Sequence, residues 1–236
     1  EQGWEYTFRC TGTDYAGADT LMQFLVEEKG FKKIAIIHVN TEGGVSGANR
    51  AEEKLAEYGL KLVAREQFTQ NDPDFSGQVL RMKEAGAEAV VFWGGGQADA
   101  NITLQQIKQL WGSVPDEVYF TGATLLGQSQ MLEIVGKENL EGISFYTGFI
   151  PDYNNEQHVR FINDFKEIDP EKQVPADVAA RVYDAVYIIA NALNDMGSYD
   201  VNAEDFSIKL RDAIDNVSFQ GVQGQFDFSV TYNGDG

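Results

Sequence analysis

Short apolar runs alternate with longer amphipathic segments through the first 146 residues of the chain. The apolar runs are typical of strands that are covered on both faces, and the amphipathic segments have the period of helices. Strands that alternate with helices of about a dozen residues favour a parallel sheet with helices on both faces. This pattern predicts an α/β fold.

The boundaries of these elements follow from periodicity and from glycines. The expected strands are 33–38, 61–68, 89–93, 118–120 and 142–146, after an extended opening segment at 6–9. The expected helices are 18–29, 47–58, 75–85, 98–111 and one through 131–135. Gly30 and Gly59 end the first two helices, and Asp74 is placed to cap the third. We expect residues 40–47 to form an open loop.

The alternation stops at Pro151. Three helices are expected over 155–168, 175–195 and 203–216, the second of them long and amphipathic. A β-like segment follows, in which Phe226 and Phe228 alternate with polar neighbours. These helices have apolar faces and no sheet to cover them, so we expect a second lobe whose own strands lie outside this sequence.

Composition excludes several function classes. The formal charge of −19 argues against nucleic acid, which is bound mainly through Lys and Arg, and favours a solvated acidic surface over an acidic docking face. The single cysteine, Cys10, excludes an internal disulfide and a CxxC site, and His38 and His158 lack metal-site spacing. We therefore expect no metal and no cofactor.

No apolar run approaches the roughly 20 residues that cross a bilayer, and the first residues lack the features of a signal peptide.

The stretch AVVFWGGGQADA, residues 89–100, ends an apolar run in three glycines. Gly94 and Gly96 fit the first two positions of the dinucleotide fingerprint GxGxxG, but Asp99 occupies the third, where glycine permits close packing. A carboxylate there would also repel phosphate. Since no GK[ST] motif occurs either, nucleotide binding is disfavoured.

Ligands of open α/β sheets bind beyond the carboxyl ends of the strands. The segments that leave the predicted strands there are rich in glycine and hydroxyl residues, which offer N–H groups at helix N-termini. Short loops before helices need such residues in any case, and a tryptophan after a strand can belong to the core. The candidate ligand contacts are Gly43, Gly44, Trp93, Gly95, Gly96, Gln97, Thr121 and Thr124.

No catalytic constellation is present. Ser46 and Ser129 lack the GxSxG elbow, and Asp72 and Asp74 are typical of turns and caps. The tyrosines at 183 and 187 are spaced for packing along one helix face. The sequence therefore indicates a protein that is not an enzyme.

Taken together, several segments resemble the type I periplasmic binding proteins of the branched-chain amino-acid transporter family. The resemblance lies in YTFRCTGTD, KKIAIIHVNTEGG, NDPDFSGQVLRMKEAGAEAVVFWGGG, ARVYDAVYIIANAL and GVQGQFDF, in that order along nearly the whole chain. It implies a receptor of two lobes that closes on a small ligand and delivers it to the permease of an ABC transporter.

On this resemblance residues 1–146 form the second lobe, 147–216 the helices of the first, and 217–236 the final crossing between lobes. Hinge positions are implied at Arg9, Thr147 and Gln225.

The resemblance also implies departures at the site. The family's ligand-facing tyrosine falls at Gly43, its aromatic residue after the glycine pair falls near Gly96 or Gln97, and its acidic partner for the ligand ammonium falls near Thr124. An uncharged Thr124 cannot neutralise a buried ammonium. A carboxylate-bearing, aromatic or amide-like ligand is the alternative to a plain amino acid.

We therefore expect a solute-binding protein for a small polar ligand, in the periplasm or outside the cell, with or without a lipid anchor. The alternative from another class is the ligand-sensing domain of a membrane receptor. A nucleotide enzyme is a third hypothesis, which the incomplete fingerprints disfavour.

Overall fold

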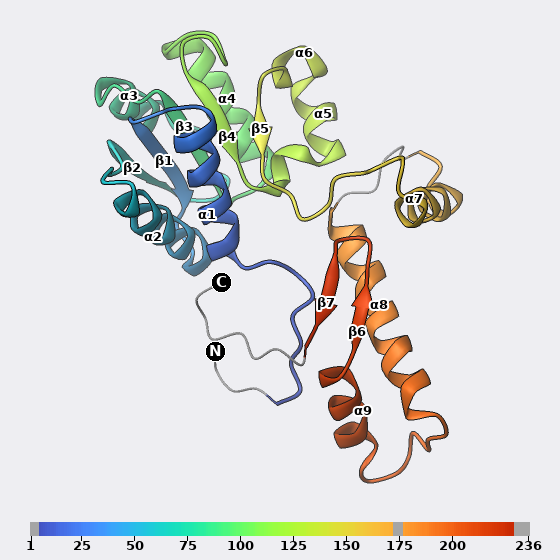
Figure 1. The fold of residues 1–236 in the computed structure, drawn as a ribbon. Coiled ribbons are helices and arrows are strands. Elements are labelled where there is room, and N and C mark those ends of the chain that lie inside the picture. Colours follow the sequence, from blue (N-terminus) through green and yellow to red (C-terminus); the bar gives the residue numbers. More distant parts are fainter. Residues whose placement is uncertain (1–4, 172–176, 229–236) are drawn as a thin grey trace. The chain divides into compact units, whose positions relative to one another are not determined.

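The structure, a computed structural model, describes residues 5–171 and 177–228. The chain divides into two compact units, one formed by Thr13–Thr147 and the other by the residues up to Gly12 together with those from Gly148 onward (Figure 1). We call them the sheet unit and the helical unit. No described helix is long and apolar enough to cross a membrane.

The sheet unit is built on a parallel five-stranded sheet of order β2-β1-β3-β4-β5. The strands are β1 Ile34–Val39, β2 Ala64–Phe68, β3 Ala89–Trp93, β4 Tyr119–Gly122 and β5 Ser144–Phe145. This confirms the predicted α/β class. β3 has its predicted bounds, β1 is displaced by one residue, and β2 and β5 are shorter than predicted.

Helices cover both faces of this sheet (Figure 1). They are α1 Asp14–Gln23, continued by the π-helical turn η1 Phe24–Glu28, then α2 Glu42–Glu57, α3 Ser76–Glu84, α4 Gln97–Leu110, the 3-10 turn η2 Thr124–Gly127, α5 Ser129–Val135 and α6 Lys137–Leu140. Because side chains alternate along a strand, Ile34 and Ile36 pack with α1 and α2, while Ala35 and Ile37 pack with α3 and α4. Fully burying an isoleucine side chain contributes about 1.5–3 kcal/mol to the free energy of unfolding.

Two predicted details of the helix starts are wrong. Most of the expected loop 40–47 is helical, because Thr41 caps α2 by accepting a hydrogen bond from the Gly44 N–H at 3.2 Å. Helix α3 has Phe75 at its N-cap position. Asp74 still stabilises the start of α3, since its carboxylate accepts a hydrogen bond from the Ser76 N–H at 2.9 Å.

The helical unit contains α7 Glu156–Ile168, α8 Asp177–Met196, α9 Phe206–Asp215 and an antiparallel hairpin of β6 Ser218–Gln220 and β7 Gln225–Asp227. All three predicted helices are present; the predicted start of the second, at 175–176, lies outside the described residues. Phe226 and Phe228 are half-buried and flank an exposed Asp227, which confirms the predicted alternation.

The opening segment packs with these helices. Phe8 and Cys10 lie against the core of α8 and α9, and the Phe8 ring meets Phe228 edge-on at 5.6 Å. The division of the chain therefore differs from the expected one, in which the first residues belonged with the sheet. Gln225, one of the implied hinge positions, lies within β7 of the hairpin, and the hinge there stays a prediction.

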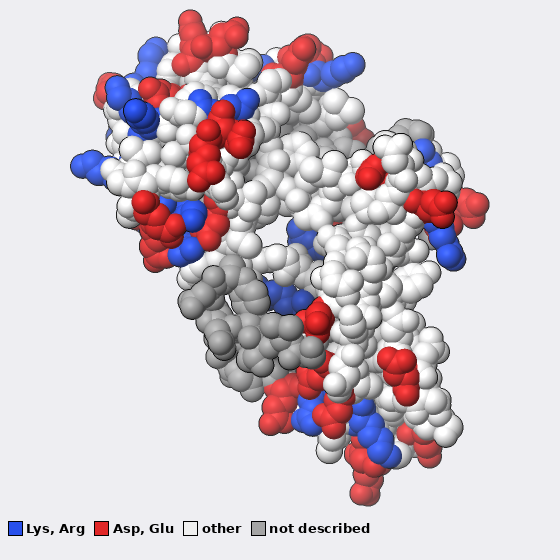
Figure 2. Space-filling model, in the orientation of Figure 1, with Lys and Arg blue, Asp and Glu red and all other residues white. Residues whose placement is uncertain are grey.

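Helix α8 carries an apolar stripe on its exposed side. Val178, Val182, Val186 and Ile189 are 49%, 61%, 59% and 45% exposed. The surface over this helix is largely free of charged side chains (Figure 2). Beside the stripe, an apolar hollow of about 400 Å³ lies between α8, α9 and the opening segment. The predicted helix face without a sheet to cover it is thus present.

Close packing of α2 on the sheet supplies a test of the fold. A Cβ on Gly47 would stand 1.9 Å from Nε1 of the buried Trp93, whereas a Cβ on Gly43 would meet nothing nearer than 3.8 Å. Gly47→Ala should therefore lower the free energy of unfolding by about 1–3 kcal/mol through overpacking. Urea denaturation followed by tryptophan fluorescence measures the change.

Gly43→Ala is the matched control. It adds the same methyl group to the same helix, and it should leave stability unchanged or raise it by up to about 1 kcal/mol. Equal losses for both variants would contradict the close contact of α2 with Trp93.

Candidate functional site

The carboxyl ends of the strands meet at one edge of the sheet. The register pairs Val39 with Phe68, His38 with Trp93, and Phe92 with Gly122. Each segment that follows a strand therefore begins at the same level. The predicted candidates from Gly43 to Thr124 all lie on these segments or at the strand ends, so the structure brings them to a common edge.

The glycine loop after β3 is shaped by a buried carboxylate. Gly94 and Gly95 have φ of +81° and +76°, which favours glycine, and a Cβ on Gly95 would stand 2.8 Å from the Phe68 ring. Below the loop, the fully buried Asp99 accepts hydrogen bonds from the N–H groups of Gly96 and Asn71, each at 2.8 Å. This carboxylate holds two loops together and leaves the loop unsuited to phosphate.

Asp99 was missed as an organising residue by the sequence reasoning, which considered only its conflict with phosphate. A signal was available, because an aspartate three residues after a glycine N-cap can accept from the cap N–H. Gly96 was expected to contact a ligand, but its N–H already donates to Asp99.

Trp93, a candidate ligand contact, instead belongs to the core, the alternative that the sequence left open. Its side chain is 3% exposed, belongs to the core of α1 and α2, and stacks on Tyr146 at 5.6 Å. The half-buried Tyr146 follows β5 at the same edge. Sequence reasoning placed Tyr146 at the end of the expected strand 142–146 and did not name its ring as a candidate, although an aromatic residue at a strand end was the available signal.

Thr121, on β4, and Thr124, just after it, differ in the hydroxyl that they can offer to a ligand. The fully buried Thr121 hydroxyl donates to the Ser144 carbonyl at 3.0 Å and accepts from the Ser144 hydroxyl at 2.8 Å. The expectation that it donates to a ligand is wrong, because it joins β4 to β5. Thr124 is half-buried and begins the turn η2, so it stays a candidate contact.

Gly43, Gly44 and Gln97 lie at helix starts. Gly44 gives its N–H to Thr41, while the exposed Gly43 sits in the first turn of the 16-residue helix α2. The first N–H groups of a helix have no intrahelical partner, and its N-terminus carries partial positive charge. The Gln97 carboxamide bonds to Gln128, which ties the start of α4 to the segment after η2. The edge can thus offer N–H and hydroxyl groups to a negatively charged or polar ligand.

His38 lies near the end of β1, where its surroundings disfavour the charged form. Burial lowers the pKa of His38, and Arg65 adds to this effect, while a hydrogen bond to the Val39 carbonyl and the charge of Glu52 oppose it. The Nδ1–H faces that carbonyl at 3.1 Å, and Nε2 accepts from Arg65 at 3.3 Å. Both ring nitrogens are occupied, and no group of metal-ligating side chains occurs in the described part of the chain.

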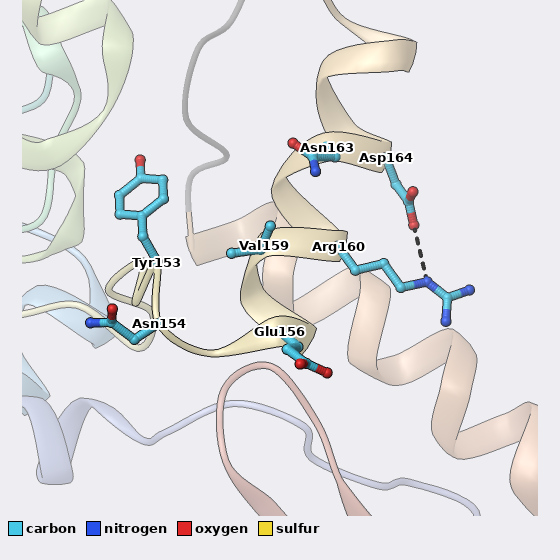
Figure 3. A pocket seen from close by; sticks show the side chains of 7 residues that line it. All are labelled: Tyr153, Asn154, Glu156, Val159, Arg160, Asn163 and Asp164. Carbon is cyan, nitrogen blue, oxygen red and sulfur yellow. Dashed lines mark ion pairs between the residues drawn. The ribbon is translucent and has the colours of Figure 1, made fainter.

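The helical unit has a surface pocket of about 390 Å³ at the start of α7 (Figure 3). It is lined by Tyr153, Asn154, Glu156, Val159, Arg160, Asn163 and Asp164. Arg160 and Asp164 pair at 3.8 Å, and Figure 3 shows them on the side of the helix away from Tyr153. Their side chains are 71% and 50% exposed, so this ion pair is largely solvated.

Comparison with known proteins decides the family. A sequence model described as periplasmic binding protein matches residues 1–235. The chain belongs to the periplasmic binding protein family. Among curated relatives of this family, the Leu/Ile/Val-binding protein homolog 1 of Brucella suis biovar 1 (strain 1330) is 28% identical over 201 residues, which are 85% of this chain and 51% of the relative. The chain spans about half the length of such a relative.

Solved structures show the same fold. The branched-chain amino-acid transporter binding protein LivJ of Streptococcus pneumoniae, in complex with isoleucine, has a TM-score of 0.80 at 22% identity, over 96% of this chain and 61% of that one. A solute-binding protein of R. palustris, in complex with benzoate, has a TM-score of 0.77 at 15% identity, over 93% and 57%. The predicted resemblance and fold class are confirmed.

The role of Asp99 can be tested by removing its charge. Asp99→Asn keeps the shape but turns an NH₂ group toward one of the two N–H donors, so the free energy of unfolding should fall by about 1–3 kcal/mol. Urea denaturation measures the loss. Asp116→Asn, at an exposed position of the same unit, should change stability by less than about 0.5 kcal/mol. Similar values for the two variants would contradict a role for Asp99 in holding the loops.

The pKa of His38 predicts a pH dependence. An unfolded histidine titrates near pH 6.5, above the lowered pKa of the folded state, so the unfolded chain binds more protons as pH falls. The free energy of unfolding should therefore decline as pH drops from about 6.5 toward the folded pKa.

His38→Gln should flatten this decline when unfolding is followed at closely spaced pH values. His158→Gln, in the helical unit, is the matched control and should leave the decline in place. A decline of equal slope in wild type and His38→Gln would show that other groups cause it.

Proposed function

We propose that this chain is part of an extracytoplasmic solute-binding protein that captures a small carboxylate-bearing ligand for an ABC transporter. The observation that carries the proposal is the single edge at which five strands end, with the start of α2 and the turn η2 beside it. Membership of the periplasmic binding protein family supports it.

The edge would bind a carboxylate without a basic side chain. The segments 40–43, 69–76, 94–97, 123–128 and 146–151 contain no Lys or Arg. An anion would therefore be met by N–H groups at the start of α2, near Gly43, and by the hydroxyl of Thr124, rather than by a basic side chain. Gln97 and Gly95 complete the proposed contacts, and Trp93 would support Tyr146 from behind.

The relatives narrow the ligand class. The Brucella suis relative is named for leucine, isoleucine and valine, and the two solved structures hold isoleucine and benzoate. A carboxylate is common to all these ligands, whereas benzoate lacks an ammonium group. Since Thr124 provides no negative charge, a carboxylate is the part of the ligand that this edge is best suited to bind.

The apolar stripe of α8 supports the expected second lobe. Four exposed valine and isoleucine side chains on one helix face make a surface that proteins normally bury. We propose that further strands, of the kind that the longer relatives have room for, cover it. The assignment of the sheet unit and the helical unit to different lobes, the absence of catalysis, delivery to a permease and a periplasmic or extracellular location belong to the same proposal.

A thermal-shift screen tests the ligand. A chimera with the opening part of a full-length relative ahead of residue 1 is heated with isoleucine, leucine, benzoate, acetamide and AMP, and the chain alone is measured in parallel. A ligand at about a hundred times its dissociation constant should add about 2.7 kcal/mol and raise the midpoint by several degrees. A shift with a carboxylate supports the proposal, and a shift with AMP alone would overturn it.

Thr124→Val tests the proposed contact in the same chimera. It removes one hydroxyl with little change of shape, and the dissociation constant of the best carboxylate should rise about two- to tenfold by calorimetry. Ser113→Ala, which deletes an exposed hydroxyl on the connection from α4 to β4 at the opposite edge, should leave affinity unchanged. Unchanged affinity in both variants would remove Thr124 from the site.

A further inference from the structure

Both connections of the helical unit to the sheet unit start beside one side chain, that of Gln223. The chain passes from one unit to the other after Gly12 and again before Gly148. The Gln223 carboxamide nitrogen donates to the Cys10 carbonyl at 3.4 Å, two residues before the first boundary. Its oxygen lies 3.4 Å from where a Cβ on Gly148 would stand, at the second boundary. Cys10, 213 positions before Gln223, is thus hydrogen-bonded to it, and Gly148 lies beside it.

Asp184 holds Gln223 in this position. It is fully buried on α8, and its carboxylate accepts from the N–H groups of Val222 and Gln223 at 2.8 and 3.0 Å and from the Gln223 carboxamide at 3.2 Å. A buried carboxylate with three donors is a strong, geometrically defined acceptor. A Cβ on Gly221 would stand 2.6 Å from Asp184, so the tip of the β6–β7 hairpin needs glycine there.

The same cluster also contacts the Cys10 side chain. Its Sγ lies 3.9 Å from the Arg181 carbonyl, one turn before Asp184 on α8. Main chain and side chain of Cys10 are thereby both held against the helical unit. The neighbouring Gln225 has no such role among the described residues, where its carboxamide bonds to Ser218 and to the Phe226 carbonyl within its own hairpin.

We propose that Gln223, held by Asp184, is an anchor that fixes the points at which both connections leave the helical unit. Gln223 is a positioning residue: it acts on the segments around Cys10 and Gly148 and not on a ligand. Any movement of the two units then begins beyond these points, at residues 11–13 and at Thr147. The anchor goes beyond the proposed function and does not rest on it, since it can be tested without a ligand.

The single cysteine is a native probe of the first connection. Gln223→Met keeps the side-chain length and removes both hydrogen bonds of the carboxamide, while the Asp184 bonds to the hairpin N–H groups remain. The half-buried Cys10 thiol should then react with Ellman's reagent about three- to tenfold faster, as expected when a local opening loses one hydrogen bond.

Thermolysin reports on the second connection. Cleavage within residues 147–150, mapped by mass spectrometry, should accelerate in Gln223→Met, because the buried Phe149 must open before it is cut and its core includes Val222, the residue before Gln223. Gln225→Met, the same change two residues along, should alter neither rate. Gln223→Glu, which replaces the donating NH₂ with an oxygen, should act like Gln223→Met and serves if that variant does not fold.

Three results would overturn the anchor. Wild-type rates at both connections would show that Gln223 holds neither, and acceleration at only one would show that it does not join them. The third result is a Cys10 labelling rate that rises with denaturant as steeply as global unfolding does. It would show that the variant loses stability throughout and does not release Cys10 locally.

Discussion

The rest of the sheet unit depends on the burial of β1 and β3 on both faces. Every residue of these two strands is buried, alternately against α1 and α2 and against α3 and α4. Strands buried in this way need a helix between each pair, which makes them parallel and turns their carboxyl ends to one edge. Everything that the chain can offer a ligand from this unit follows from that alignment.

In each unit a buried aspartate accepts hydrogen bonds from backbone N–H groups at a turn. A glycine turn lets the backbone bend sharply but leaves N–H groups in places that water cannot reach. Asp99 accepts such groups from Gly96 and Asn71 in the sheet unit, and Asp184 accepts them from Val222 and Gln223 in the helical unit. In each case a carboxylate on a helix holds a distant segment, Asn71 for Asp99 and the β6–β7 hairpin for Asp184. A search for catalytic acids by sequence would misread both residues, because their charge is used for structure.

The chemistry of the edge agrees with the family. The proposed contacts are helix N–H groups, hydroxyls and carboxamides, which are polar and uncharged. Their rigidity comes from bonds made behind them, between Thr121 and Ser144 and between Gln97 and Gln128. The site therefore depends as much on residues that never face a ligand as on those that could.

The sequence by itself determined the α/β class, the bounds of β3 and the presence of the helices, because alternation, helical period and glycine breaks are local properties. It also disfavoured nucleotide binding, through Asp99 in the place of a glycine. Only the tertiary structure decided which edge residues are accessible. Trp93 is buried because Gly47 lets α2 approach it, and the Thr121 hydroxyl is occupied because β5 brings Ser144 beside it. Likewise Cys10 joins the helical unit through Gln223, 213 positions later. Periodicity shows which face of an element a side chain is on, but contacts between distant segments decide what it meets there.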